Sequence, residues 1–181
     1  HQSSAFGGEL LAANSILFQI QFIMGDILTG LSQAGAIYSG IAFGEHNKPM
    51  LNDTLRISFI WAIGFGLAQS VFYYASRHSI LSYFTDLPNV IATAQEYDLF
   101  IAFFPLISAL GIVYYGVFNG ALYTKPICIS MLITVGCYLT AYFTLIPLYG
   151  NIGLWLAFLV FYIARSGFLL LFVPKLQQRF V

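Results

Sequence analysis

The sequence predicts an all-α membrane protein with several transmembrane helices. Of its 181 residues, 59% are hydrophobic and 8% are charged, whereas soluble domains carry about 25% charged residues. Seven Lys and Arg balance seven Asp and Glu, so the chain lacks the positive excess typical of nucleic-acid binding. Its high hydrophobicity also excludes intrinsic disorder. The apolar segments are continuous and do not alternate as barrel strands do, which indicates helices.

Five largely apolar segments are long enough to cross a bilayer, which takes about 20 residues of α-helix. We expect membrane-spanning helices at residues 10–43, 53–76, 98–122, 126–147 and 152–174. The first is longer than one crossing needs, so it should tilt, kink near Gly30 or Gly35, or extend into water. The turn-forming residues 147–151 separate the last two helices.

The stretch between the second and third spans, residues 78–97, is more polar than its neighbours. Pro88 lies within it, and proline is favoured at the first position of a helix. We therefore expect one or two short helices here, lying at the surface of the membrane.

The basic residues predict the orientation, because cytoplasmic loops are enriched in Lys and Arg. Five basic residues flank one side of the expected bundle: Lys48, Arg56, Lys125, Lys175 and Arg179. Arg77 flanks the other side. We expect a multi-pass protein of the inner (plasma) membrane with its C-terminus in the cytoplasm and its N-terminus outside.

The first residues indicate a piece of a longer protein. The chain begins with His1, and its first nine residues contain neither Lys nor Arg. They lack the basic start and short apolar core of a signal peptide. We expect residues 1–181 to form one partial membrane domain.

Polar residues follow one face of the first span: Ser15, Gln19, Asp26, Thr29 and Gln33. Their spacing matches the helical repeat, and a carboxylate at the centre of a membrane helix costs about 2.5–3.5 kcal/mol. The stripe is therefore expected to line a cavity, with Asp26 responding to protons or cations. The alternative is a hydrogen-bonding seam between helices.

The third span carries a weaker polar face with Ser108, Tyr115 and Asn119. Pro105 removes a backbone donor and should bend this helix, and bent helices often line transport sites. The alternative for the tyrosine is an aromatic belt at the membrane interface.

Small residues and one basic residue point to packing within the membrane. The pairs Gly40–Gly44 and Gly116–Gly120 have the spacing that allows helices to approach closely. Arg165 lies about 13 Å along its helix from Pro174, so we expect a carboxylate or helix-end carbonyl partner and a structural role.

Motifs of soluble enzymes are missing from the sequence. It contains no Gly-rich phosphate loop with Lys, no His-Glu-x-x-His and no Cys-x-x-Cys. His1, His46 and His78 fall in expected loops or at the chain start, so no metal site is expected within the membrane. We expect neither enzymatic activity nor a cofactor.

Three stretches closely resemble the multidrug and toxic compound extrusion (MATE) transporters, and in particular their DinF-like branch. They are residues 10–17 (LLAANSIL) followed by the Gly40–Gly44 pair, residues 116–121 (GVFNGA) and residues 150–165 (GNIGLWLAFLVFYIAR). The resemblance runs in consistent order over essentially the whole chain, and the last stretch is its most specific part.

The resemblance implies that the five spans are the last five of twelve and form most of the C-terminal six-helix lobe of a two-lobed bundle. It also implies export of drug-like, often cationic or amphipathic compounds in exchange for protons or sodium ions. The expected partners are a small-molecule substrate, the lipid bilayer and the N-terminal lobe of the same polypeptide, without nucleic acid.

The chain departs from the DinF-like pattern where acidic residues are usual, with Thr29, Ala36 and Tyr115 in their places. The expected cavity lining is Gln19, Asp26, Thr29, Gln33, Tyr115 and Asn119. One alternative is a flippase for lipids or oligosaccharides, which a strongly basic cavity would favour. The other is a non-transporting or degenerate membrane scaffold, which the lost acidic positions favour.

Overall fold

The computed structural model describes residues 2–179 and contains six helices. They are α1 (Gln2–Gly44), α2 (Lys48–Phe84), α3 (Pro88–Gln95), α4 (Asp98–Gly120), α5 (Thr124–Tyr149) and α6 (Asn151–Gln178). All but α3 are long and apolar enough to cross a membrane. No strand occurs within residues 2–179, and the predicted all-α membrane fold is confirmed.

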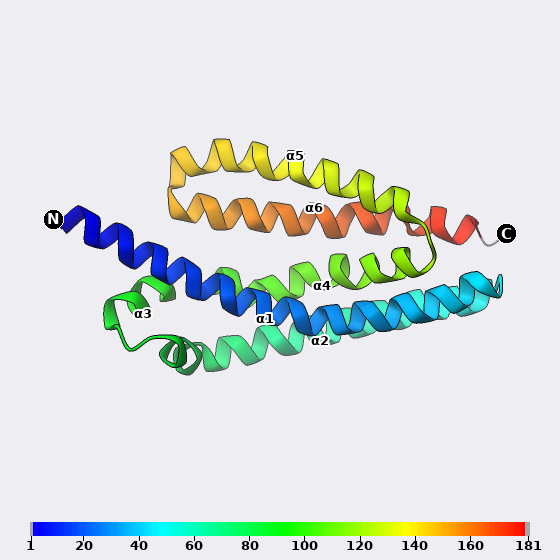
Figure 1. Cartoon of the computed structure of the whole chain (residues 1–181), viewed down its shortest axis with the longest axis horizontal. Helices are drawn as coiled ribbons and strands as arrows, with labels where there is room; N and C mark the ends of the chain where they lie inside the picture. The colour runs from blue at the N-terminus through cyan, green and yellow to red at the C-terminus, as the bar shows by residue number, and fades with distance from the viewer. Residues whose placement is uncertain (1, 180–181) are drawn as a thin grey trace.

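The long helices lie side by side along one axis (Figure 1). One antiparallel pair is formed by α1 and α2, another by α5 and α6, and α4 lies between the two pairs. Because α4 packs against α1, α2 and α6, it is the most buried of the five spanning helices. The described N-terminal end and α3 lie at one end of the bundle, and α6 ends at the other (Figure 1).

The first helix, α1, is continuous through Gly30 and Gly35. At about 1.5 Å per residue it is roughly 65 Å long, and its axis changes direction near its middle (Figure 1). A Cβ added at Gly35 would lie 3.0 Å from the Val117 side chain and 3.4 Å from Ser58 Oγ. Gly35 is therefore a point of close contact with α4 and α2 within an unbroken helix.

The second helix is longer than the sequence predicts. It runs to Phe84, so residues 78–84 extend α2 instead of forming a separate interfacial helix. Tyr73 and Leu81 lie about two helical turns apart, and both are fully buried. The packed face of α2 therefore continues past the polar residues 77–79. The predicted start at Pro88 is confirmed, since α3 begins there.

Two glycines of α4 allow it to touch α1. A Cβ at Gly116 would overlap the backbone oxygen of Ser32, and one at Gly120 would overlap that of Ala36. Any larger residue at these positions would push the helices apart. At Gly44, by contrast, an added Cβ would meet no other atom of residues 2–179 within 4 Å. Gly40 also meets α4, since a Cβ there would lie 3.4 Å from the Gly120 carbonyl oxygen. The expected packing role therefore holds for Gly40 and for the α4 pair, and it is wrong for Gly44.

Ser166 of α6 inserts its hydroxyl into the backbone of α4. Its Oγ donates to the Ile107 carbonyl at 2.9 Å and accepts from the Gly111 N–H at 3.0 Å. These two backbone groups are one helical turn apart, as are the partners of an ordinary helical hydrogen bond. The contact ties α6 to α4 near Pro105, where the proline ring already removes a backbone donor.

The first and last of the stretches that carry the family resemblance are joined by an amide network. Asn14 of α1 and Asn151 of α6 exchange side-chain hydrogen bonds of 2.7 and 3.1 Å, and Trp155 Nε1 donates to Asn14 Oδ1 at 3.2 Å. Phe18 stacks on the buried Trp155 ring with centroids 4.9 Å apart. This network holds α1 against the start of α6.

Candidate substrate cavity

A hollow of about 720 Å³ lies between α1, α4 and α6. We call it the central hollow. Its volume is within the roughly 300–1,000 Å³ range of small-molecule sites. Its lining combines polar residues of α1, aromatic residues of all three helices and two charged residues, Asp26 and Arg165.

The central hollow brings together four of the six residues expected from the sequence. Asp26, Thr29 and Gln33 of α1 and Tyr115 of α4 border it, together with Ser15 of the same stripe. All five side chains are exposed, although the Thr29 hydroxyl also donates to the Gly25 carbonyl at 3.0 Å. Polar atoms in the hollow are thus free to contact water or a ligand.

The other two expected residues do not border the central hollow. Gln19 is exposed on α1, and Asn119 is exposed near the end of α4. Successive helical residues are about 100° apart, so the Gln19 side chain lies roughly 80° from that of Thr29. Asp26 lies only about 20° from Gln19 around the helix and does border the hollow, so spacing along α1 does not separate the two residues.

Gln21 is a lining residue that the polar stripe misses. It lies roughly 80° from Thr29 on the side opposite Gln19. Its side chain is 7% exposed, and Nε2 donates to the Tyr162 hydroxyl at 3.2 Å. Its Oε1 is buried without a hydrogen-bond partner in the described part of the chain, so this amide retains an acceptor close to the hollow.

Aromatic rings form the apolar wall of the central hollow. Phe104 and Tyr162 meet edge to face with centroids 4.9 Å apart, and Phe18 meets Phe158 edge to face at 5.2 Å. Such pairs hold one another's ring orientation and leave faces and edges for a ligand. The sequence does not single out these residues, because aromatic side chains are common throughout apolar helices.

The contact of Arg165 differs from the expected one. Its guanidinium lies 5.5 Å from the centroid of the Tyr115 ring, and no carboxylate lies within 4.0 Å of it among residues 2–179. Arg165 also borders the central hollow. The expected carboxylate or carbonyl partner is therefore replaced by an aromatic face, and the side chain faces the same space as Asp26.

A second pair of charges lies at the end of the bundle. Arg77 of α2 lies 3.5 Å from Asp98 of α4, and Asp98 is 2% exposed. The Tyr73 hydroxyl is buried nearby on α2. This ion pair is not apparent in the sequence, because both residues coincide with the expected ends of spans. It joins the end of α2 to the start of α4.

A second hollow, of about 620 Å³, lies between α1, α2 and α4. We call it the side groove. Trp61 and Phe65 line it, and its one charged lining residue is Asp53, near the start of α2. The side groove is similar in volume to the central hollow but lacks charge at the middle of the helices.

Comparison with known proteins identifies the family. The MatE family model matches residues 3–144. DNA damage-inducible protein F of Escherichia coli K12 is 26% identical over 160 residues, which cover 88% of this chain and 35% of that protein. The chain spans about a third of the length of this curated relative. The family model covers most of the length of this chain. The chain therefore belongs to the MatE family, as the resemblance to the DinF-like MATE transporters predicted.

Proposed function

We propose that this chain forms most of one lobe of a membrane transporter that exports amphipathic, drug-like compounds in exchange for protons or sodium ions. Membership in the MatE family supports transport as the general activity. The central hollow supports the assignment of the substrate site to the space between α1, α4 and α6.

The observation that carries the proposal is the position of Asp26. It lies midway along the described span Gly7–Gly44, and its side chain is exposed beside the central hollow. A carboxylate at that depth costs about 2.5–3.5 kcal/mol on insertion scales, so such residues usually serve function. Among the lining residues it is the only acid.

The lining suits a flat molecule with an apolar body. Rings of Phe18, Phe104, Phe158 and Tyr162 offer faces and edges for stacking. The ionised Asp26 attracts a positive group or a coupling cation, and protonation removes that attraction. Competition between substrate and coupling ion for one carboxylate is a direct route to exchange.

When the exported molecule carries no net charge, the membrane potential contributes to the driving force, because the entering ion then moves one net positive charge. One positive charge entering down 100 mV releases about 2.3 kcal/mol. At 1.4 kcal/mol per tenfold, this sustains roughly a fifty-fold gradient of substrate.

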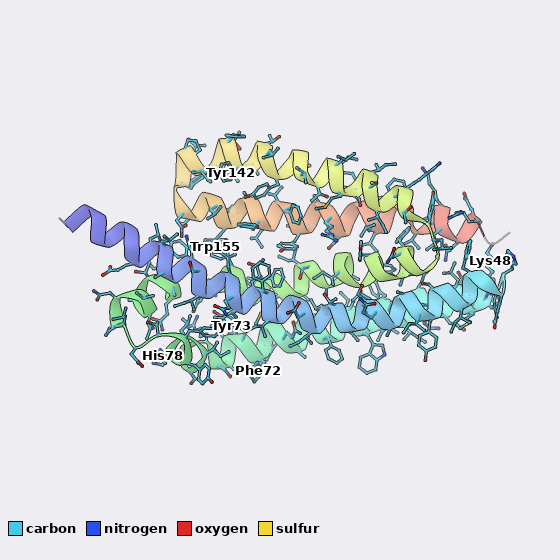
Figure 2. The ribbon with its side chains drawn as sticks, viewed as in Figure 1. Lys48, Phe72, Tyr73, His78, Tyr142 and Trp155 are labelled. Atoms are coloured by element: carbon cyan, nitrogen blue, oxygen red, sulfur yellow. The ribbon has the colours of Figure 1, made fainter. Side chains whose placement is uncertain are left out.

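The distribution of basic residues supports an orientation in the inner (plasma) membrane with the C-terminus on the cytoplasmic side. Lys48 lies at the end of the bundle where α6 also ends, and His78 lies toward the other end (Figure 2). The α4–α5 turn, which precedes Lys125, is at the Lys48 end as well (Figure 1). Clustering of Lys and Arg at one end follows the positive-inside rule.

The test is the Asp26→Asn variant of the full-length transporter that contains this lobe. It is reconstituted in liposomes, and efflux of a cationic dye is measured against an imposed pH or sodium gradient. We expect the gradient-driven rate to fall about tenfold, the equivalent of 1.4 kcal/mol. Asp86→Asn, at an exposed position between α2 and α3, serves as control. Unchanged gradient dependence in the Asp26 variant would remove this carboxylate from the mechanism.

A further inference from the structure

The guanidinium of Arg165 has no hydrogen-bond acceptor among the residues that the structure describes. The group carries five N–H donors and stays charged in proteins. The guanidinium lies over the Tyr115 ring, 5.5 Å from its centroid. Its hydrogen bonding is therefore completed by water, by a bound anion or by a group outside residues 2–179.

The position of Arg165 along α6 prevents its charge from reaching the polar surface of the membrane. The residue lies near the middle of α6 (Asn151–Gln178), roughly 20 Å along the helix from either end. A side chain at that depth does not reach the polar edge of the membrane. Its half-buried side chain borders the central hollow, so a ligand in the hollow can balance its charge.

The Tyr115 ring is the contact of the Arg165 guanidinium. A guanidinium that stacks flat on an aromatic ring keeps its edge donors available. Those donors form a fork that matches a carboxylate, sulfonate or phosphate with two parallel hydrogen bonds. Arg165 and Tyr115 also border a smaller space of about 250 Å³ between α4, α5 and α6, which leaves room around the fork.

The charge balance of the central hollow agrees with an anionic contact. Its two charged lining residues are Asp26 and Arg165, so the formal charge of the lining is zero. They are not within 4.0 Å of each other, and each remains open to a ligand. A simple cation would be attracted by the carboxylate and repelled by the guanidinium.

We infer that Arg165 binds an oxyanion carried by the transported molecule, and that the central hollow takes zwitterionic and anionic amphipaths as well as cationic ones, each with an aromatic or apolar body. The inference rests on the proposed function and extends it, because Asp26 alone would select cations. The oxyanion belongs either to a soluble amphipath or to a phospholipid headgroup.

The test uses three probes with one fluorescent body and different charges. Dansylglycine carries a carboxylate, its methyl ester is neutral, and dansylcadaverine carries an ammonium group. Their binding to the full-length transporter is measured by fluorescence titration in dodecyl maltoside micelles, which carry no phosphate group. We expect the wild type to bind dansylglycine about tenfold more tightly than the ester, as charge-assisted hydrogen bonds allow.

Arg165→Gln is expected to abolish the preference for the acid over the ester and to leave dansylcadaverine binding unchanged or tighter. Arg165→Lys should retain part of the preference, because it keeps the charge and loses the fork. Arg179→Gln is the matched control, since Arg179 lies 4.6 Å over the Tyr123 ring at the end of α6, outside the central hollow.

Equal weakening of all three probes by Arg165→Gln would assign the residue to structure and overturn the inference. Equal affinity of the wild type for acid and ester would overturn it too. Transport by the same samples separates the two proposals: wild-type protein that binds dansylglycine but moves none of the probes would contradict the proposed function alone.

Phosphatidylglycerol added to the micelles distinguishes the two sources of the oxyanion. Competition with dansylglycine in the wild type but not in Arg165→Gln would assign the site to a lipid headgroup. Undiminished dansylglycine binding would assign it to a soluble amphipath. Either result retains Arg165 as the oxyanion contact.

Discussion

The Arg77–Asp98 pair and the two charged residues of the central hollow, Asp26 and Arg165, balance their charges in different ways. Arg77 and Asp98 lie 3.5 Å apart, and Asp98 is almost completely buried. Asp26 and Arg165 border the same hollow without forming an ion pair. The first arrangement places a partly exposed guanidinium beside a buried carboxyl. In the second arrangement both charged groups are accessible to water or a ligand. An Arg and an Asp therefore join two helices at the end of the bundle, whereas in the central hollow the same two residue types are available for binding.

The largest effect is expected from Arg77→Gln. Removing Arg77 leaves the buried Asp98 carboxyl unpaired. Breaking a fully buried pair costs about 3–5 kcal/mol, and because the Arg77 side chain is 40% exposed we expect a cost of about 2 kcal/mol. We expect a clear fall in the thermal unfolding midpoint of the full-length transporter in detergent. Arg77→Gln with Asp98→Asn should recover most of the loss, because no unpaired charge remains. A single variant as stable as the wild type would show that the pair does not stabilise the bundle.

A smaller effect of opposite sign is expected at Asp26. Asp26→Leu removes a carboxylate from mid-membrane depth and should raise the free energy of unfolding by about 1 kcal/mol. This gain is smaller than the cost that insertion scales assign to a carboxylate, because the Asp26 side chain is already exposed beside the hollow. Exchange activity should be lost in the same protein, as is common when a site is replaced for stability. A destabilised Asp26→Leu protein would instead indicate that the carboxylate has a structural partner.

The smallest effect is expected at Tyr115, the ring under Arg165. Tyr115→Leu removes the cation–π contact, and dansylglycine affinity should fall about threefold, in line with the weaker values for such contacts. Tyr115→Phe keeps the ring and should bind nearly as the wild type does. If Phe weakened binding as much as Leu, the tyrosine hydroxyl rather than the ring would be the relevant group.

The fold was largely predictable because hydropathy and length alone identify membrane helices. The order of the five spans follows directly from the apolar segments. The exception is the end of α2, where the polar residues 77–79 resemble a helix end. Burial of Leu81 against other helices extends α2 to Phe84, and such tertiary packing is not visible in local composition.

The central hollow was predictable only in part. Helical spacing identifies Asp26, Thr29 and Gln33, because polar residues stand out on an apolar helix. Gln21 lies off that stripe, and its place beside the hollow follows from how α1 is rotated against α6. The contact between Arg165 and Tyr115 depends on the packing of α4 against α6. No spacing within a single helix reveals such a pairing.

The central hollow and the side groove are similar in volume, so labelling them in competition tests the assignment of the substrate site most directly. The full-length transporter is irradiated with a photoreactive aryl-azide analogue of dansylglycine, with and without excess dansylglycine, and labelled peptides are identified by mass spectrometry. We expect competed labelling near Phe158 and Tyr162, which border the central hollow. Competed labelling concentrated near Trp61 and Phe65 of the side groove, with α6 unlabelled, would contradict a substrate site between α1, α4 and α6.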